Sequence, residues 1–258
     1  MAKKWAKFPH AEKAYAYDVA ALKKQWARLH RGDCEPLPKD ADAIGAWQAF
    51  HAGDFGHAVD AGLSAGDSGV NAAVKAQVVY AHYLEPADKA KAALFEEAAD
   101  WAEERRGKAP KDANAHYLYA FAMGRYSQQI SVAKALAQGL GGKVKDALTT
   151  SLKLEPKHAD ACIAYGAYQA EVIDKVGALV AGVTYGAKKD AAIEQFQKAL
   201  KLNPESAIAR IEYANGLIML FGKSRLDEAT KLYEQAAACK PADAMERLDV
   251  ERAKAELE

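Results

Sequence analysis

The sequence predicts an all-α protein, an α-solenoid of about five helix pairs, and three observations carry this prediction. Alanine is by far the commonest residue and only 8 of the 258 residues are proline, a composition that favours helix almost throughout. Two segments near the end share the same internal spacing of four, three and five residues: Ala192, Phe196, Ala199, Pro204 and then Ala229, Tyr233, Ala236, Pro241. Further prolines, at positions 110 and 156, end earlier units of the same kind.

Residues 1–38 are expected to form an N-terminal helix and a proline-rich linker. Between positions 11 and 30, apolar residues recur at three- and four-residue steps, as on an amphipathic helix: Tyr15, Val19, Leu22, Trp26 and Leu29. Residues 32–38 cannot continue that helix, because Pro36 and Pro38 remove backbone donors and force an extended chain.

Residues 39–241 are expected to form the helical array. Repeat one covers about 39–72, with a turn at Gly53-Asp54-Phe55, and repeat two covers about 73–110 with a long charged helix over 87–106. The intervals between Pro110, Pro156, Pro204 and Pro241 are 46, 48 and 37 residues, whereas an uninterrupted repeat of this kind has 34. The two larger excesses fall between the paired helices, at 127–143 and 173–189.

Both inserts are apolar with helical spacing, so we expect them to be shielded from water. The apolar residues concerned are Ile130, Val132, Ala133, Leu136 and Leu140 in one insert and Val172, Val176, Leu179, Val180 and Val183 in the other. We expect each insert to lengthen the first helix of its pair, in repeats three and four, and to return by a glycine-rich turn. Whether the inserts cover a groove or form a binding surface stays open. Residues 242–258 are expected to be a C-terminal capping helix.

The array resembles the tetratricopeptide repeat (TPR) family over about 39–241. The alanine, aromatic and proline positions match the second helix of a TPR, and Gly45-Ala46 with Ala58 resembles the small positions of repeat one. From His158 through Tyr185-Gly186-Ala187 to Pro204, the layout is similar to TPR proteins of the regulator-of-microtubule-dynamics type and their bacterial relatives. The resemblance implies architecture, and it does not by itself transfer microtubule binding.

What the TPR resemblance implies for function is a non-catalytic scaffold that binds a protein or peptide partner on a concave face. The matching positions on the first helix of each pair are Trp47, Phe50, Tyr117, Phe121, Arg125, Ile163, Glu171, Ile211 and Asn215. The lysine with which some TPR proteins hold a chaperone's terminal carboxylate is replaced by Ala43, Gln77, Tyr117, Ile163 or Ile211, so that mode is disfavoured. Each aromatic at these positions is equally well explained as core.

No motif in the sequence supports an enzyme, a metal site or a cofactor. Gly62-Leu63-Ser64-Ala65-Gly66 fits the nucleophile elbow, but that motif needs a strand before the serine, and here a helix is expected. Gly66-Asp67-Ser68-Gly69 has no β-barrel around it, so both motifs are interpreted as the turn between repeats one and two. None of the seven histidines forms an H-E-x-x-H motif or an i, i+4 pair.

Charge and cysteine content point to a cytoplasmic protein that does not bind nucleic acid. With 35 basic and 35 acidic residues, the chain has no net field to attract a polyanion. Cys34, Cys162 and Cys239 suggest neither a disulfide framework nor a zinc site, although a trimmed exported form stays open. The most apolar run, 176–187, is too short to span a bilayer. The alternative function is a transport accessory that binds a small apolar ligand or docks a solute-binding protein, and the oligomeric state stays open.

Overall fold

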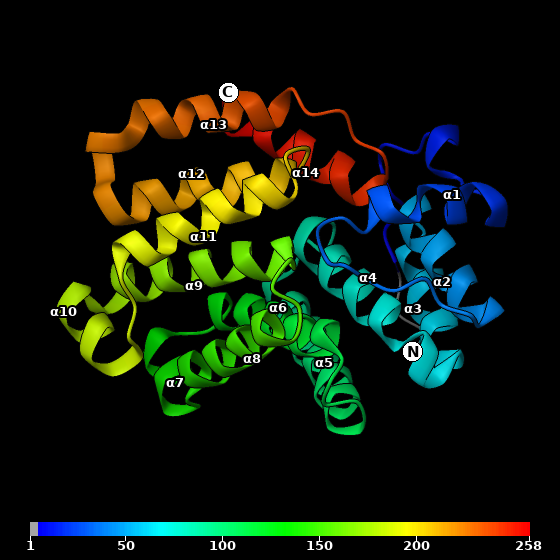
Figure 1. Cartoon of the computed structure of the whole chain (residues 1–258), viewed down its shortest axis with the longest axis horizontal. Coiled ribbons are helices and arrows are strands. Elements are labelled where there is room, and N and C mark those ends of the chain that lie inside the picture. The colour runs from blue at the N-terminus through cyan, green and yellow to red at the C-terminus, as the bar shows by residue number, and fades with distance from the viewer. Residues whose placement is uncertain (1–4) are drawn as a thin grey trace. The chain divides into compact units, whose positions relative to one another are not determined.

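The computed structural model describes residues 5–258, and every regular element in this part of the chain is helical (Figure 1). The predicted all-α fold class is therefore confirmed. The chain divides into two compact units. Unit 1 comprises Met1–His30, of which residues 5–30 are described, with Glu35–Ser131 and Ala242–Met245, and unit 2 comprises Arg31–Cys34, Val132–Pro241 and Glu246–Glu258.

Unit 1 is a stack of helices in chain order. Its helices are α1 (Val19–Leu29), α2 (Ala41–Ala52), α3 (Phe55–Ser64), α4 (Val70–Tyr83), α5 (Asp88–Lys108) and α6 (Ala113–Gln128). From α2 to α6 each helix packs on the next, and α4 also packs on α2 and on α6. Contacts to the next helix and to the one after it are those of stacked helix pairs, in which each unit buries its apolar face on its neighbours.

The N-terminal helix is shorter than predicted. We expected a helix over 11–30, but α1 begins only at Val19, after Asp18, whose side chain accepts a hydrogen bond from the backbone N–H of Ala21 at 2.8 Å. Lys13–Tyr15 forms a single 3₁₀ turn (η1), which buries the Tyr15 ring without extending the helix. The apolar spacing at Tyr15 therefore reflects the burial of its ring and not a helical backbone.

Unit 2 contains the rest of repeat three, repeats four and five, residues 132–143 of the first insert and the whole second insert. Its elements are α7 (Val132–Ala137), α8 (Leu140–Leu154), α9 (Ala159–Val176), α10 (Ala178–Val180), the π-helical turn η3 (Ala181–Tyr185), α11 (Lys189–Leu202), α12 (Ala207–Phe221), α13 (Leu226–Ala237) and most of α14 (Ala244–Ala255). Helix α9 packs on α8, α11 and α12, and α12 packs on α11 and α13. With 18 residues, α9 is the lengthened helix of repeat four.

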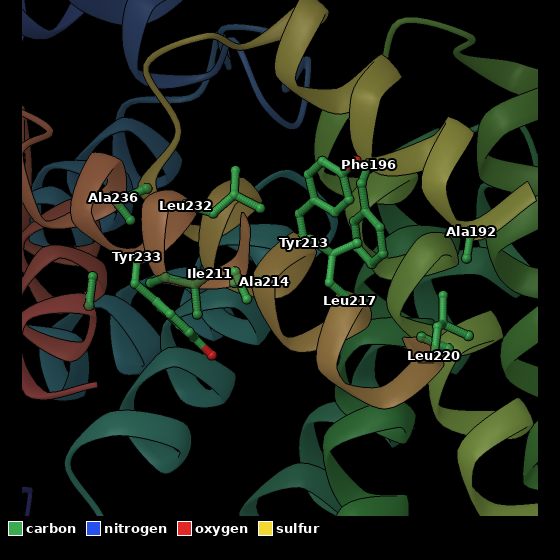
Figure 2. Packing of buried hydrophobic residues seen from close by; sticks show 14 of the residues in the cluster. Ala192, Phe196, Ile211, Tyr213, Ala214, Leu217, Leu220, Leu232, Tyr233 and Ala236 are labelled. Carbon is green, nitrogen blue, oxygen red and sulfur yellow. The ribbon is translucent and has the colours of Figure 1, made fainter. Parts of the chain in front are cut away.

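The core of unit 2 is built on the spacing that the sequence repeats (Figure 2). Ala192, Phe196 and Ala199 on α11 are fully buried. The Phe196 ring stacks on Tyr213 at 5.2 Å between ring centres, and a Cβ added at Gly166 or Gly216 would come within 2.9 or 2.5 Å of the Phe196 ring. The two glycines therefore provide the space that the phenylalanine occupies.

Side-chain caps begin the first helix of four of the five pairs. Asp40, Asp112, His158 and Ser206 accept hydrogen bonds from backbone N–H groups in the first turns of α2, α6, α9 and α12 respectively. Each cap satisfies a donor that a helix start leaves without an intrahelical partner. These residues fix where the chain turns from one pair into the next.

The serine motifs form the turn that the sequence predicted. Ser64 is the last residue of α3, and Gly66–Ser68 forms the 3₁₀ turn η2 that leads into α4. The Ser68 hydroxyl donates to the carbonyl of Ala65 at 2.9 Å. A helix precedes Ser64 where a nucleophile elbow requires a strand.

The inserts contact each other, but the expectation that their apolar residues are shielded is wrong. A Cβ at Gly141, at the start of α8, would lie 2.9 Å from the Tyr185 ring, so the end of the second insert lies against the first. Leu140 is buried as expected. In contrast, Val132 and Leu136 on α7 and Leu179, Val180 and Val183 on α10 and η3 are exposed. The short helices of the inserts have too few neighbours to cover both of their faces.

Candidate functional site

The predicted residues of repeat three form a ladder on one face of α6, in unit 1. Tyr117, Phe121 and Arg125 are four residues apart, a spacing that places them on the same helix face. The rings of Tyr117 and Phe121 stack at 5.8 Å with planes 9° apart, and the Arg125 guanidinium carbon lies 5.7 Å from the centre of the Phe121 ring. Tyr117 is buried, whereas Phe121 and Arg125 are half-buried. The α6 ladder therefore presents an aromatic ring and a cation side by side.

A polar network holds the first turn of α6, on which the ladder stands. Asp112 Oδ1 accepts from the backbone N–H groups of Asn114 and Ala115, and its Oδ2 accepts from Nε and Nη2 of Arg105 at 3.2 and 3.0 Å. The amides of Asn71 and Asn114 both donate to the carboxylate of Glu35. Because Asp112 serves both as cap and as ion-pair partner, it fixes the start of α6 against the end of α5.

Replacement of Asp112 by alanine is expected to lower the free energy of unfolding by about 1–2 kcal/mol, because the cap is lost and Arg105 loses its partner. Urea unfolding of the two proteins measures this difference. The matched control is Asp88→Ala, at the first residue of α5, where the carboxylate is exposed and lies 4.0 Å from Lys91. Its effect is expected to stay within about 0.5 kcal/mol. Equal effects of the two substitutions would contradict the role assigned to Asp112.

In unit 2 the predicted positions lie on the adjacent helices α9 and α12. Ile163 and Ile211 are buried, so their side chains belong to the core. Glu171 and Asn215 are half-buried, with Glu171 3.6 Å from Lys175 and the Asn215 side-chain oxygen accepting from the Tyr233 hydroxyl. Burial, with the nearby carboxylate of Glu256, raises the pKa of Tyr233 to about 12. Tyr233 therefore remains a hydrogen-bond donor that orients the Asn215 amide.

Trp47 and Phe50 are core residues of unit 1. Each is 1% exposed, and their rings meet edge to face at 5.4 Å between centres. The ammonium of Lys75 lies 5.7 Å from the Phe50 ring centre. A partner cannot reach either side chain in this structure, so repeat one contributes packing where the resemblance implied a contact.

A buried polar cluster in unit 1 was missed by the sequence analysis. His51 Nδ1 donates to Asp243 Oδ2 at 2.7 Å, since a carboxylate accepts hydrogen bonds, and His51 Nε2 lies 3.3 Å from His30 Nε2. All three residues are almost fully buried, and the His30 ring stacks on Trp26 at 4.0 Å. His51 and Asp243 are 192 residues apart in the chain, so no local sequence pattern predicts their hydrogen bond. Because all three side chains are almost fully buried, we interpret the cluster as a tie between α1, α2 and residues 242–245.

One shallow pocket of about 150 Å³ lies on unit 1, between the α3–α4 turn and α5. Leu63, Val70 and Trp101 line it, together with Lys108, which pairs with Glu104 at 2.7 Å and with Asp67 at 3.5 Å. Pockets for small ligands usually measure about 300–1,000 Å³. This pocket therefore does not support the alternative of an enclosed apolar ligand.

Neither a membrane span nor a metal cluster adds a candidate site within the described part of the chain. Among residues 5–258, no helix combines the length and the apolar character that crossing a membrane requires. Over the same residues, no three His, Cys, Asp or Glu side chains are grouped so that they could hold a metal ion. The candidate sites are therefore the α6 ladder in unit 1 and, separately, the pair Glu171 and Asn215 in unit 2.

Comparisons with known proteins agree with this architecture. The family model described as regulator of microtubule dynamics protein 1-3 matches residues 70–258, from the start of α4 onwards. The crystal structure of TTC0263, a thermophilic TPR protein of Thermus thermophilus, is similar with a TM-score of 0.57 and 15% identity, over 83% of this chain and 97% of that one. At this identity the likeness shows the fold alone. Curated proteins gave no match.

Proposed function

Because the chain belongs to the family of regulator of microtubule dynamics proteins 1-3, with a TPR-like helical fold, we propose that it is a non-catalytic adaptor that binds a protein or peptide partner. Helical scaffolds of this kind typically mediate protein interactions. The observation that carries the proposal is the α6 ladder, in which the half-buried side chains of Phe121 and Arg125 lie side by side on one face of the helix. We propose a cytoplasmic setting, because the three cysteines are far apart in the sequence and form no disulfide-framework pattern.

The chemistry of the ladder indicates how a partner would be held. Aromatic residues and arginine are the side chains that most often dominate binding energy at interfaces. A half-buried ring accepts an apolar side chain, and the guanidinium beside it pairs with a carboxylate or a backbone carbonyl. In unit 2, Glu171 and Asn215 offer an acceptor and an amide on neighbouring helices, and we propose them as a separate contact site of that unit.

Replacement of Phe121 by alanine is expected to weaken partner binding by about 2 kcal/mol, roughly 30-fold in Kd, as is typical of an anchor residue. The partner is recovered by affinity capture from the native lysate, and its Kd is measured by calorimetry for each variant. Tyr117 is buried and stacks on Phe121, so Tyr117→Ala is expected to lower stability as well as affinity. A Tyr117/Phe121/Arg125 triple change is expected to abolish capture.

The matched control is Arg106→Ala. Arg106 on α5 lies over the Tyr119 ring at 4.0 Å, so this variant removes a cation–π pair of the same unit away from the ladder. It is expected to leave partner affinity unchanged. If Phe121→Ala reduces stability while affinity for the recovered partner stays at the wild-type value, the ladder is core and the proposal fails.

A further inference from the structure

The two most exposed large apolar side chains among residues 5–258 lie together on the second insert of unit 2. Leu179 is 81% exposed and Val183 is 82% exposed, while the other exposed large apolar side chains in this part of the chain reach at most 50%. One of these others, Val180 at 49%, lies between them. We call Leu179, Val180 and Val183 the insert tip. Single exposed apolar residues are ordinary, but adjacent ones with this exposure need an explanation.

The structure holds the insert tip in place. Leu179 and Val183 are four residues apart on the helical turns α10 and η3, so they share a face, while Ala181 between them is fully buried. The backbone N–H of Ala187 donates to the Ala181 carbonyl at 3.1 Å, and that of Gly186 donates to the Gly182 carbonyl at 3.1 Å. The buried side of the turn is therefore anchored, and the apolar side is directed away from the core of unit 2.

Glycines in the left-handed region bound the turn at both ends. Gly177 has φ 80° and Gly186 has φ 67°, values that other residues rarely adopt. They let the chain leave α9 and return to α11 within a short segment, and Figure 1 shows α10 at the end of the α9–α11 pair. The insert tip is thus carried at one end of a helix pair.

The size and composition of the insert tip argue against a protein occupant. A stable protein interface takes about 800 Å² from each partner, which three aliphatic side chains cannot supply. Leucine and valine are also under-represented among the residues that dominate protein interfaces. Aliphatic side chains can, however, enter the boundary between headgroups and acyl chains of a bilayer, where each buried CH₂ contributes about 0.8 kcal/mol to weak, reversible binding.

The residues around the insert tip fit that boundary. Tyr185 follows it and is half-buried, and tyrosine is enriched at the headgroup level of membranes. Exposed Lys175 and Lys188 flank the turn, and their stems can lie along apolar surface while the ammonium groups stay in water. Asp174 and Asp190 are exposed as well, so the local charge is nearly balanced and apolar contact has to dominate.

We propose that the insert tip docks unit 2 reversibly on a lipid surface by inserting Leu179 and Val183 among the acyl chains. This docking is separate from the proposed partner binding, because the α6 ladder belongs to unit 1. The insert tip contains none of the ladder residues. Because apolar contact dominates, binding is expected to persist in high salt, unlike attraction between charges.

The test is co-sedimentation of the full chain with vesicles of phosphatidylcholine and phosphatidylglycerol. The wild type is expected to bind, and Leu179→Ser with Val183→Ser is expected to lower the partition coefficient at least tenfold. The matched control is Leu154→Ser with Leu226→Ser, two exposed leucines on α8 and α13 of the same unit, which is expected to bind like the wild type. Far-ultraviolet circular dichroism and the melting temperature check that all three proteins are folded.

Four results overturn the proposal. These are absence of wild-type binding, wild-type binding that survives the tip variant, equal loss in tip and control variants, and binding that disappears in 0.5 M salt. Light scattering on the same proteins measures their oligomeric state and so tests the competing occupant, a second copy of the chain. A wild-type dimer that the tip variant converts to a monomer, without vesicle binding, would assign the insert tip to a second copy of the chain.

Discussion

Replacement of Phe196 by alanine is expected to lower the free energy of unfolding by about 3–5 kcal/mol, the largest effect of any single change considered for this chain. The Phe196 ring is fully buried in unit 2 and stacks on Tyr213 (Figure 2). It also lies close to Gly166 and Gly216. Helix backbones at the two glycines cannot close around an alanine, so a cavity remains. Urea unfolding followed by circular dichroism measures the loss.

A substitution of the glycine that faces the Phe196 ring tests the same contact. Gly216→Ala is expected to lower the free energy of unfolding by about 1–3 kcal/mol. The added Cβ would lie 2.5 Å from the buried Phe196 ring, so the ring or the helix would have to shift. Gly124→Ala on α6 is the control, since nothing lies within 4 Å of the added Cβ and alanine favours helix. It is expected to be neutral or stabilising. A Gly216→Ala protein as stable as the control would contradict this packing.

Replacement of Asp243 by alanine is expected to lower the free energy of unfolding by about 3 kcal/mol, because it leaves the buried Nδ1–H of His51 without its acceptor. Besides this loss of overall stability, the substitution is expected to loosen the segment around position 243. Residues 242–245 would keep other attachments to the rest of unit 1, among them the 2.8 Å hydrogen bond from the Tyr17 hydroxyl to the Ala242 carbonyl. Hydrogen exchange is therefore expected to accelerate from position 242 into α14.

The companion variant Asp243→Asn separates hydrogen bonding from charge. Its side-chain oxygen can still accept from His51 Nδ1, so a smaller loss than for alanine is expected. Asp174→Ala, at an exposed carboxylate near the end of α9, serves as the surface control and is expected to change stability by less than about 0.5 kcal/mol. Indistinguishable unfolding of Asp243→Ala and wild type would show that the tie contributes nothing.

Helix type and pairing were predictable because they depend on short-range patterns. The spacing shared by 192–204 and 229–241 predicted α11 and α13, and the charged stretch over 87–106 predicted α5 (Asp88–Lys108). The predicted start of α1 was wrong, because Tyr15 fits the helical spacing although its backbone forms a single 3₁₀ turn. Local propensity gives the kind of element, whereas caps such as Asp18 fix its ends.

The candidate site was only partly predictable. The register of the repeats placed Tyr117, Phe121 and Arg125 on one helix face, and they stack as the spacing implies. The same register placed Trp47 and Phe50 at equivalent positions, yet these are core. What differs is the set of neighbours that covers each helix, and that set is not contained in the helix's own sequence.

The sequence by itself determined that this protein is an all-α array of TPR-like pairs, because alanine-lined seams, glycine turns and proline ends act between residues close in the chain. Only the tertiary structure decided which side chains are accessible. It buried Ile163 and Ile211, joined His51 to Asp243 across 192 positions, and left Leu179 and Val183 in solvent. Burial depends on which distant segments pack together, and packing is a property of the folded chain as a whole.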